Sequence, residues 1–269
     1  MTLNEAIKTL AEAGVESPEY DARELFLHFG NLKPYELVSR DISLGGGEII
    51  SAIERRAKKE PLQYIVGEVN FYRESYKVTP DCLIPRQDTE ILVDYAVKNI
   101  PWGESFIDLC TGSGCVAIST LKNTDNTRAL ALDISQKALN IAKENAEKNG
   151  VFERIDFELG DALNFSPRGR VFAILSNPPY VTNKEYEELA EEIYHEPKEA
   201  FVGGADGLDF YKKIVPACKD KLKTSGFIAF EIGKDQAQAL EKIAEDNAMN
   251  TEIINDFSGL ARVAVLRKK

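Results

Sequence analysis

From about residue 88 onward, short apolar runs alternate with segments of helical periodicity, and this alternation limits the possible fold more than any other feature. The apolar runs lie at 105–110, 128–135, 154–162, 171–180 and 226–233. Alternating strands and helices are typical of a parallel sheet covered on both faces. Helices are expected at 89–99, 207–223 and 234–247, a glycine-bearing turn and helix at 111–122, and a further helix after 135 that ends at Asn149-Gly150. Two last runs, 251–256 and 261–267, are separated only by a short turn, so we expect them to pair antiparallel.

The first 60 residues have a different pattern. Leu3, Ile7 and Leu10 recur at helical spacing, and Ser17-Pro18 is a typical helix start. Further helices are expected after Pro34 and from Ile49 onward. The stretch 63–78 is rich in Tyr, Val and Phe and predicts a β-hairpin. The sequence therefore predicts a helical domain over 1–60, a hairpin connector over 61–80 and an α/β domain over 81–269.

Composition excludes several classes of protein. The chain has 269 residues, of which 43% are hydrophobic and 29% charged, as in an ordinary globular protein. No apolar run approaches the roughly 18–20 residues of a membrane span. The amphipathic, partly acidic N-terminus does not resemble a signal peptide, so we expect a cytoplasmic protein without a membrane partner. Four cysteines without a CxxC pair and only two histidines predict no metal site. A net charge of −11 argues against direct nucleic-acid binding.

A glycine-bearing loop follows the first apolar run of the α/β part. Gly112-Ser113-Gly114, with Ala117, fits the pattern GxGxxA of a dinucleotide-type loop, in which glycines let the backbone approach a ligand. Asp108, Asp133 and Asp161 end the first three runs, at the sheet edge where such folds bind ligands. Asp133 has the spacing to bind ribose hydroxyls, and Asp161 to reach an adenine amino group.

The glycine loop and its acids also have simpler interpretations. A glycine-rich turn is ordinary β–α turn chemistry, and an Asp after a strand often caps a helix. The loop alone fits either NAD or S-adenosylmethionine. NAD carries a pyrophosphate that favours a helix N-terminus without a nearby anion. S-adenosylmethionine carries a sulfonium cation and no phosphate, so Asp108 beside the loop favours it.

Asn177-Pro178-Pro179-Tyr180 follows the fourth apolar run and so emerges at the same edge. These residue types suit one task, which is to hold a planar NH2 group for methyl transfer. The Asn177 side-chain oxygen and the Pro178 carbonyl can accept hydrogen bonds from its two N–H groups. The prolines restrict the backbone. Tyr180 offers a flat face. Preorganised acceptors stabilise the positive charge that develops at the nitrogen. An ordinary turn is the alternative interpretation.

With both motifs placed, the sequence closely resembles the HemK-type family, the glutamine N5-methyltransferases of peptide chain release factors. The resemblance extends to the segments 61–72, 83–93, 230–236 and 256–267. It implies a class I S-adenosylmethionine-dependent methyltransferase fold. In this α/β, Rossmann-like fold, a mostly parallel sheet has an antiparallel last strand. A small N-terminal helical domain and a β-hairpin connector precede it.

The resemblance also implies a reaction and its residues. Such enzymes methylate the glutamine of the Gly-Gly-Gln motif of release factors, using S-adenosyl-L-methionine and releasing S-adenosyl-L-homocysteine. Residues implied to contact the cofactor are Asp108, Cys110, Thr111, Gly112, Ser113, Gly114, Asp133, Asp161, Ala162 and Asn177. Residues implied to hold the substrate amide are Asn177, Pro178, Pro179 and Tyr180, with Arg86 and Thr89 beside them. Cys110, Gln87 and Ala162 depart from residues frequent in the family.

Several alternative functions remain open on the sequence alone. Nucleic-acid adenine N6-methyltransferases share the NPPY chemistry but must capture a base. A ribosomal-protein glutamine methyltransferase would look similar. An NAD-dependent dehydrogenase leaves NPPY unexplained, and a non-catalytic binding module leaves both motifs unexplained.

The acidic segment 185–199 has two interpretations of its own. It is either a solvated face or a docking site for a basic substrate surface. The second interpretation expects charge reversal at Glu188 and Glu192 to raise KM for the protein substrate.

Overall fold

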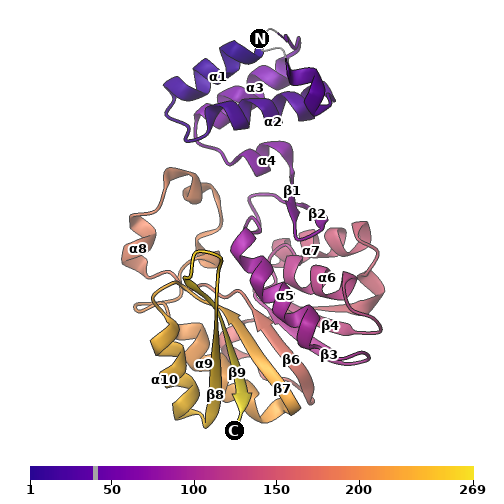
Figure 1. Cartoon of the computed structure of the whole chain (residues 1–269), viewed down its shortest axis with the longest axis vertical. Helices are drawn as coiled ribbons and strands as arrows, with labels where there is room; N and C mark the ends of the chain where they lie inside the picture. Colours follow the sequence, from indigo (N-terminus) through magenta and orange to yellow (C-terminus); the bar gives the residue numbers. More distant parts are fainter. Residues whose placement is uncertain (39–41) are drawn as a thin grey trace. The chain divides into compact units, whose positions relative to one another are not determined.

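The computed structural model describes residues 1–38 and 42–269 and contains two compact units. The first comprises Met1–Glu68 and Ala190–His195, and the second comprises Val69–Leu189 and Glu196–Lys269. Figure 1 shows the helices within residues 1–68 in indigo and violet, and the large sheet of the second unit. The first unit therefore takes a short piece of chain from far along the sequence.

The first unit is helical, as predicted. Its elements are α1 (Leu3–Glu12), α2 (Pro18–Gly30), η1 (Pro34–Val38), α3 (Gly47–Ala57), α4 (Leu62–Val66) and η5 (Glu191–His195). Thr2 and Glu5 form a capping box at the start of α1. Buried residues of α1, α2 and α3, including Leu10, Phe26 and Ile53, form one apolar core.

The hairpin is shorter than predicted. Strands β1 (Glu68–Phe71) and β2 (Glu74–Lys77) pair, but residues 62–66, expected in part as strand, form helix α4. The prediction was wrong there because strand propensity depends on packing context. Leu62 and Ile65 bury their side chains in the helical core, and Gly67, at φ 83°, ends the helix.

The second unit contains a seven-stranded sheet in the order β5-β4-β3-β6-β7-β9-β8. Its strands are β3 (Ser105–Leu109), β4 (Arg128–Asp133), β5 (Ile155–Leu159), β6 (Val171–Ser176), β7 (Leu222–Glu231), β8 (Met249–Asn255) and β9 (Ala261–Lys268). The first five strands in this order are parallel, and β9 pairs antiparallel with both β7 and β8. The predicted parallel sheet and the antiparallel pairing of its last two strands are confirmed.

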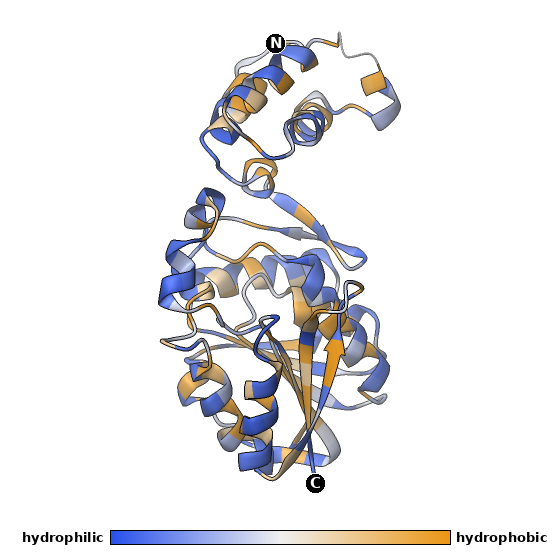
Figure 2. Cartoon of the chain, turned by 60° about the vertical axis from the view of Figure 1, so that its left-hand side comes forward, coloured by the Kyte–Doolittle hydropathy of each residue, from blue (hydrophilic) through white to orange (hydrophobic). Residues whose placement is uncertain are grey.

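Helices cover both faces of this sheet. The second unit contains the helices η2 (Gln87–Thr89), α5 (Glu90–Asn99), α6 (Cys115–Lys122), α7 (Gln136–Lys148), η3 (Phe152–Arg154), η4 (Ala162–Asn164), α8 (Asn183–Glu187), η6 (Lys198–Ala200), α9 (Asp209–Cys218), η7 (Lys219–Lys221) and α10 (Ala237–Asp246). Phe106 packs with α5 and α6, whereas its neighbour Ile107 packs with α9. This alternation follows from the two-residue period of a strand. Figure 2 shows hydrophobic colours on strands of the sheet and mixed colours along the helices.

One helix ends earlier than predicted. The helix expected over 207–223 ends as α9 at Cys218, and strand β7 already begins at Leu222. Leu222 is opposite Val171 of β6 and is buried in the core. Pairing with β6 thus extends the last parallel strand toward its amino end.

Candidate active site

A cavity opens at the carboxyl edge of the parallel strands, where the chain leaves β3, β4, β5 and β6. The predicted site residues that line it are Cys110, Gly112, Asp133, Asp161, Ala162, Asn177 and Pro179. The other predicted site residues, which lie outside its lining, are Arg86, Thr89, Asp108, Thr111, Ser113, Gly114, Pro178 and Tyr180. The structure therefore brings the glycine loop and the NPPY motif to one cavity.

Asp108 supports the glycine loop from inside the core. Its side chain is buried, and its Oδ2 accepts hydrogen bonds from the Thr111 hydroxyl at 2.6 Å and from the Ala117 amide at 3.2 Å. Burial raises the pKa of Asp108 to about 7. These contacts fix the turn between β3 and α6. The direct ligand contact predicted for Asp108 stays a prediction.

Of the two loop glycines, Gly114 is the one whose position leaves no room for a side chain. Its φ is +83°, and an added Cβ would lie 2.9 Å from the Ile118 side chain and 3.1 Å from that of Ala142. A larger residue would separate the loop from α6 and α7. Gly112, with φ +55°, has open space at its Cβ position and lines the cavity.

Asp133 joins the end of β4 to the loop. Its Oδ2 accepts from the Gly112 amide at 2.8 Å and its Oδ1 from the Ser135 amide at 2.9 Å. Burial raises its pKa, although these backbone donors favour the ionised form. The Ile134 amide is a further backbone donor to this carboxylate, which still has acceptor capacity for a ligand hydroxyl. Asp133 is thus fixed in place at the wall of the cavity.

The cavity is acidic. Among the described residues that line it, Asp81, Asp133, Asp161 and Glu199 carry carboxylates, and none is Lys or Arg. A pyrophosphate would meet like charges here, whereas a cation would be attracted. Asp161 also caps η4, because its Oδ1 accepts from the Leu163 amide at 2.9 Å. Asp161 therefore both caps η4 and lines the cavity.

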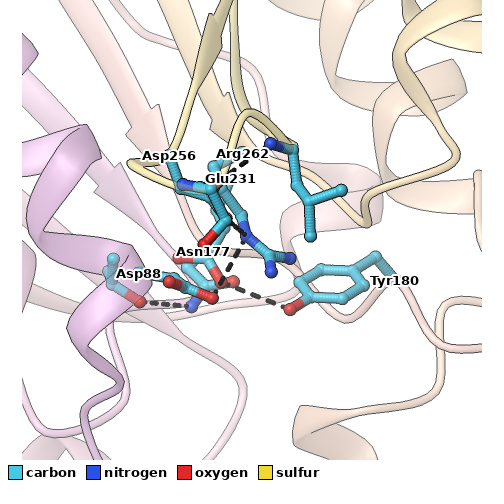
Figure 3. Close-up of polar contacts among 9 residues, drawn as sticks. Asp88, Asn177, Tyr180, Glu231, Asp256 and Arg262 are labelled. Atoms are coloured by element: carbon cyan, nitrogen blue, oxygen red, sulfur yellow. Dashed lines mark hydrogen bonds and ion pairs between the residues drawn. The ribbon is translucent and has the colours of Figure 1, made fainter.

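The NPPY motif is held at both ends by side chains from other elements (Figure 3). The Asn177 Nδ2 donates to the Thr89 Oγ1 at 3.2 Å, so the Asn177 Oδ1 is the atom left to accept a ligand proton. At the other end, the Tyr180 hydroxyl donates to the Glu231 Oε1 at 3.3 Å. The two prolines between them are buried. The motif is thus preorganised before any ligand binds.

Comparisons with known proteins agree with this geometry. Residues 87–207 match the family described as methyltransferase small domain, and residues 2–67 match the PrmC N-terminal domain. A release factor glutamine methyltransferase from Thermodesulfovibrio yellowstonii is 40% identical over 92% of this chain and 92% of its own length. One from Moorella thermoacetica is 36% identical over 97% of this chain and 95% of its own.

This chain belongs to the release factor glutamine methyltransferase family.

The fold of this family member also matches a solved structure. The ribosomal protein L11 methylase from Lactobacillus delbrueckii subsp. bulgaricus is similar with a TM-score of 0.52 and 21% identity, covering 71% of this chain and 84% of that one. The likeness concerns the fold, which is that of a class I methyltransferase. None of the helices in the described part of the chain has the length and apolar character needed to cross a bilayer.

Two contacts of this release factor methyltransferase family member involve residues that the sequence motifs did not place in the site. Glu231 is buried, and burial raises its pKa to about 7, while the nearby Thr89 and Tyr180 hydroxyls lower it. Arg262 Nε forms ion pairs with Asp88 at 3.1 Å and Asp256 at 3.0 Å. The sequence did contain one signal for Glu231, because it is a carboxylate inside the otherwise apolar run 226–233.

Two acids of the segment 185–199 already have partners within the chain. Glu192 pairs with the guanidinium of Arg56 at 2.5 Å, within the helical unit. Glu196 is buried, pairs with Arg86 and accepts the Ile84 amide at 3.0 Å. Arg86 therefore contacts this segment rather than the cavity. The docking hypothesis stays a prediction that now depends on the remaining acids.

Proposed function

We propose that this chain transfers a methyl group from S-adenosylmethionine to the side-chain amide nitrogen of the glutamine in the Gly-Gly-Gln motif of peptide chain release factors. One observation carries the chemistry: Asn177 and Pro179 of the NPPY motif line the same cavity as Gly112 of the glycine loop and Asp133 at the end of β4. The names of the relatives supply the substrate. Since release factors act on ribosomes, we place the reaction in the cytoplasm.

The cavity fits this cofactor by the chemistry of its walls. Asp133 has carboxylate lone pairs for ribose hydroxyls, and Ala162 and Leu132 offer apolar surface for an adenine ring. The acidic lining without Lys or Arg among its described residues suits a sulfonium and disfavours a pyrophosphate. When bound, S-adenosylmethionine supplies an electrophilic methyl group.

The chain's own residues would hold the amide. An amide nitrogen is a poor nucleophile because its lone pair is delocalised into the carbonyl. The Asn177 Oδ1 and the Pro178 carbonyl accept hydrogen bonds from the two N–H groups of the substrate amide. These bonds favour a pyramidal nitrogen and stabilise the positive charge that develops there. The Tyr180 ring offers a flat wall for the planar group. Alignment with the methyl donor supplies the remaining acceleration.

The test is methyl transfer from labelled S-adenosylmethionine to a purified release factor. A matched factor carries Gln→Ala in its Gly-Gly-Gln motif, and DNA, RNA and total ribosomal proteins are assayed in parallel. We expect label on the native factor and none on the variant. Label on nucleic acid alone would make the chain an adenine methyltransferase, and label on a ribosomal protein alone would change the substrate; either result would refute the proposal.

A further inference from the structure

The turn between β8 and β9 exposes two large apolar side chains. Phe257 is fully exposed, and Leu260 is 42% exposed. The turn lies at the carboxyl edge of the sheet, because β9 begins beside the end of β7, with Val263 opposite Glu231. This is the edge at which the NPPY motif emerges.

The turn is built to be rigid. The Asp256 Oδ1 accepts from the Ser258 amide at 2.8 Å and from the Leu260 amide at 2.9 Å. The Asp256 amide donates to the Leu260 carbonyl at 2.8 Å, and the Gly259 amide donates to the Asp256 carbonyl at 3.0 Å. Hydrogen bonds of this kind hold the backbone in one conformation. Phe257 is thus displayed to solvent by a fixed loop.

A chain of polar contacts ties this turn to the candidate active site (Figure 3). Arg262 bridges Asp256 of the turn and Asp88, at 3.0 and 3.1 Å. Asp88 precedes Thr89, whose hydroxyl accepts from Asn177. The apolar turn and the substrate-holding asparagine are therefore parts of one connected structure.

We propose that Phe257 and Leu260 form a docking surface for the protein substrate, contacting apolar side chains beside the loop that carries the target glutamine. This inference rests on the proposed function. A glutamine side chain offers little apolar surface, so a protein substrate must be held by contacts outside the cavity. Exposed aromatic residues next to a site are the usual anchors of such contacts. Two side chains are too small a surface for a stable dimer, which favours a substrate contact over a second copy of this chain.

The experiment compares Phe257→Ala and the double variant Phe257→Ala, Leu260→Ala with the parent enzyme. The control is Trp102→Ala, since Trp102 is 74% exposed and precedes β3 at the opposite edge of the sheet. KM for the release factor, KM for S-adenosylmethionine and kcat are measured separately, and melting temperature and sedimentation are recorded for each variant.

We expect KM for the release factor to rise about tenfold or more in the Phe257 variants, the size expected when a buried aromatic contact is lost. The kcat, KM for the cofactor and melting temperature should stay unchanged, and Trp102→Ala should match the parent. A KM for the release factor within twofold of the parent would refute the docking surface. A parent dimer that dissociates in Phe257→Ala would also refute it, by assigning the turn to self-association. If the parent enzyme did not methylate a release factor at all, the proposed function itself would fail.

Discussion

Asn177 lines the cavity, and the hydrogen bond from its amide nitrogen to Thr89 leaves its side-chain oxygen as the acceptor for a ligand. We expect Asn177→Ala to lower kcat by roughly 10²–10³, the loss found when one preorganised transition-state contact is removed. The dissociation constant for S-adenosylmethionine should change little, because Asp133 and the glycine loop remain. Single-turnover methyl transfer and calorimetric cofactor binding measure the two effects.

The control for this variant is Asn140→Ala, at an exposed position on α7. If Asn177→Ala kept turnover within a few-fold of the parent, the role assigned to Asn177 would be wrong. The sequence predicted Asn177 from its motif. The resemblance placed Thr89 beside the motif, but the sequence did not predict the hydrogen bond by which Thr89 orients Asn177, because 88 residues separate the two.

Glu231 links pH to stability. Burial raises its pKa from the ordinary 4.5 to about 7 in the folded state. As the pH rises through this interval, the unfolded chain loses this proton before the folded protein does, so stability falls. Glu231→Gln removes the effect, and we expect the variant to gain about 2–3 kcal/mol relative to the parent between pH 5 and pH 8. Urea unfolding of both proteins at these pH values provides the measurement; a difference independent of pH would contradict the assignment.

At the scale of elements, the backbone after the NPPY motif is clamped by the segment 201–207. The Val181 amide donates to the Phe201 carbonyl at 2.8 Å, and the Gly203 amide donates to the Val181 carbonyl at 2.9 Å. A Cβ at Gly203 would lie 2.3 Å from the Pro179 carbonyl oxygen and 2.9 Å from the Tyr180 Cα. Since both are backbone atoms, the motif itself would have to move.

We therefore expect Gly203→Ala to lower kcat at least tenfold and to cost about 1–3 kcal/mol of stability, as overpacking does. Gly169→Ala is the matched control, because nothing lies within 4 Å of its Cβ position. Methyl-transfer kinetics and thermal unfolding compare the two. Equal behaviour of both variants would show that the clamp does not position the motif.

Elements also mark where prediction from the sequence succeeds. The period of the apolar runs predicted every strand of the main sheet and the antiparallel end. It failed at α4, where Ile65 suits a strand but is buried in the helical core. Periodicity indicates which face of an element is buried. It does not indicate that residues 62–66 pack into the helical core, and this packing shortens the hairpin.

At the scale of the whole molecule, a buried ion-pair cluster in the helical unit joins residues that are far apart in the sequence. Arg56 is buried between Asp21, at 2.6 Å, and Glu192, at 2.5 Å. Removing a cation from a buried pair leaves uncompensated charges, so we expect Arg56→Met to destabilise the helical unit by about 3 kcal/mol or more. Hydrogen exchange should accelerate in residues 190–195. Urea unfolding and exchange mass spectrometry measure these effects.

Arg55→Met is the neighbouring control. Arg55 pairs with Glu60 but is 43% exposed, so its loss should cost less than about 1 kcal/mol. Equal destabilisation by both variants would contradict the buried bridge. The sequence could not predict this bridge, because 136 residues separate Arg56 from Glu192 and acids are common between them.

The return of residues 190–195 to the helical unit has a consequence for protein engineering and for recombination between relatives. A crossover at residue 68 would exchange an incomplete module, because Glu192 would then face a foreign partner in place of Arg56. A functional chimera requires three junctions, one after residue 68 and one at each end of the segment 190–195, so that both pieces of the helical unit are exchanged together. Natural exchange of the N-terminal helices should accordingly be rare unless the 190–195 segment changes with them.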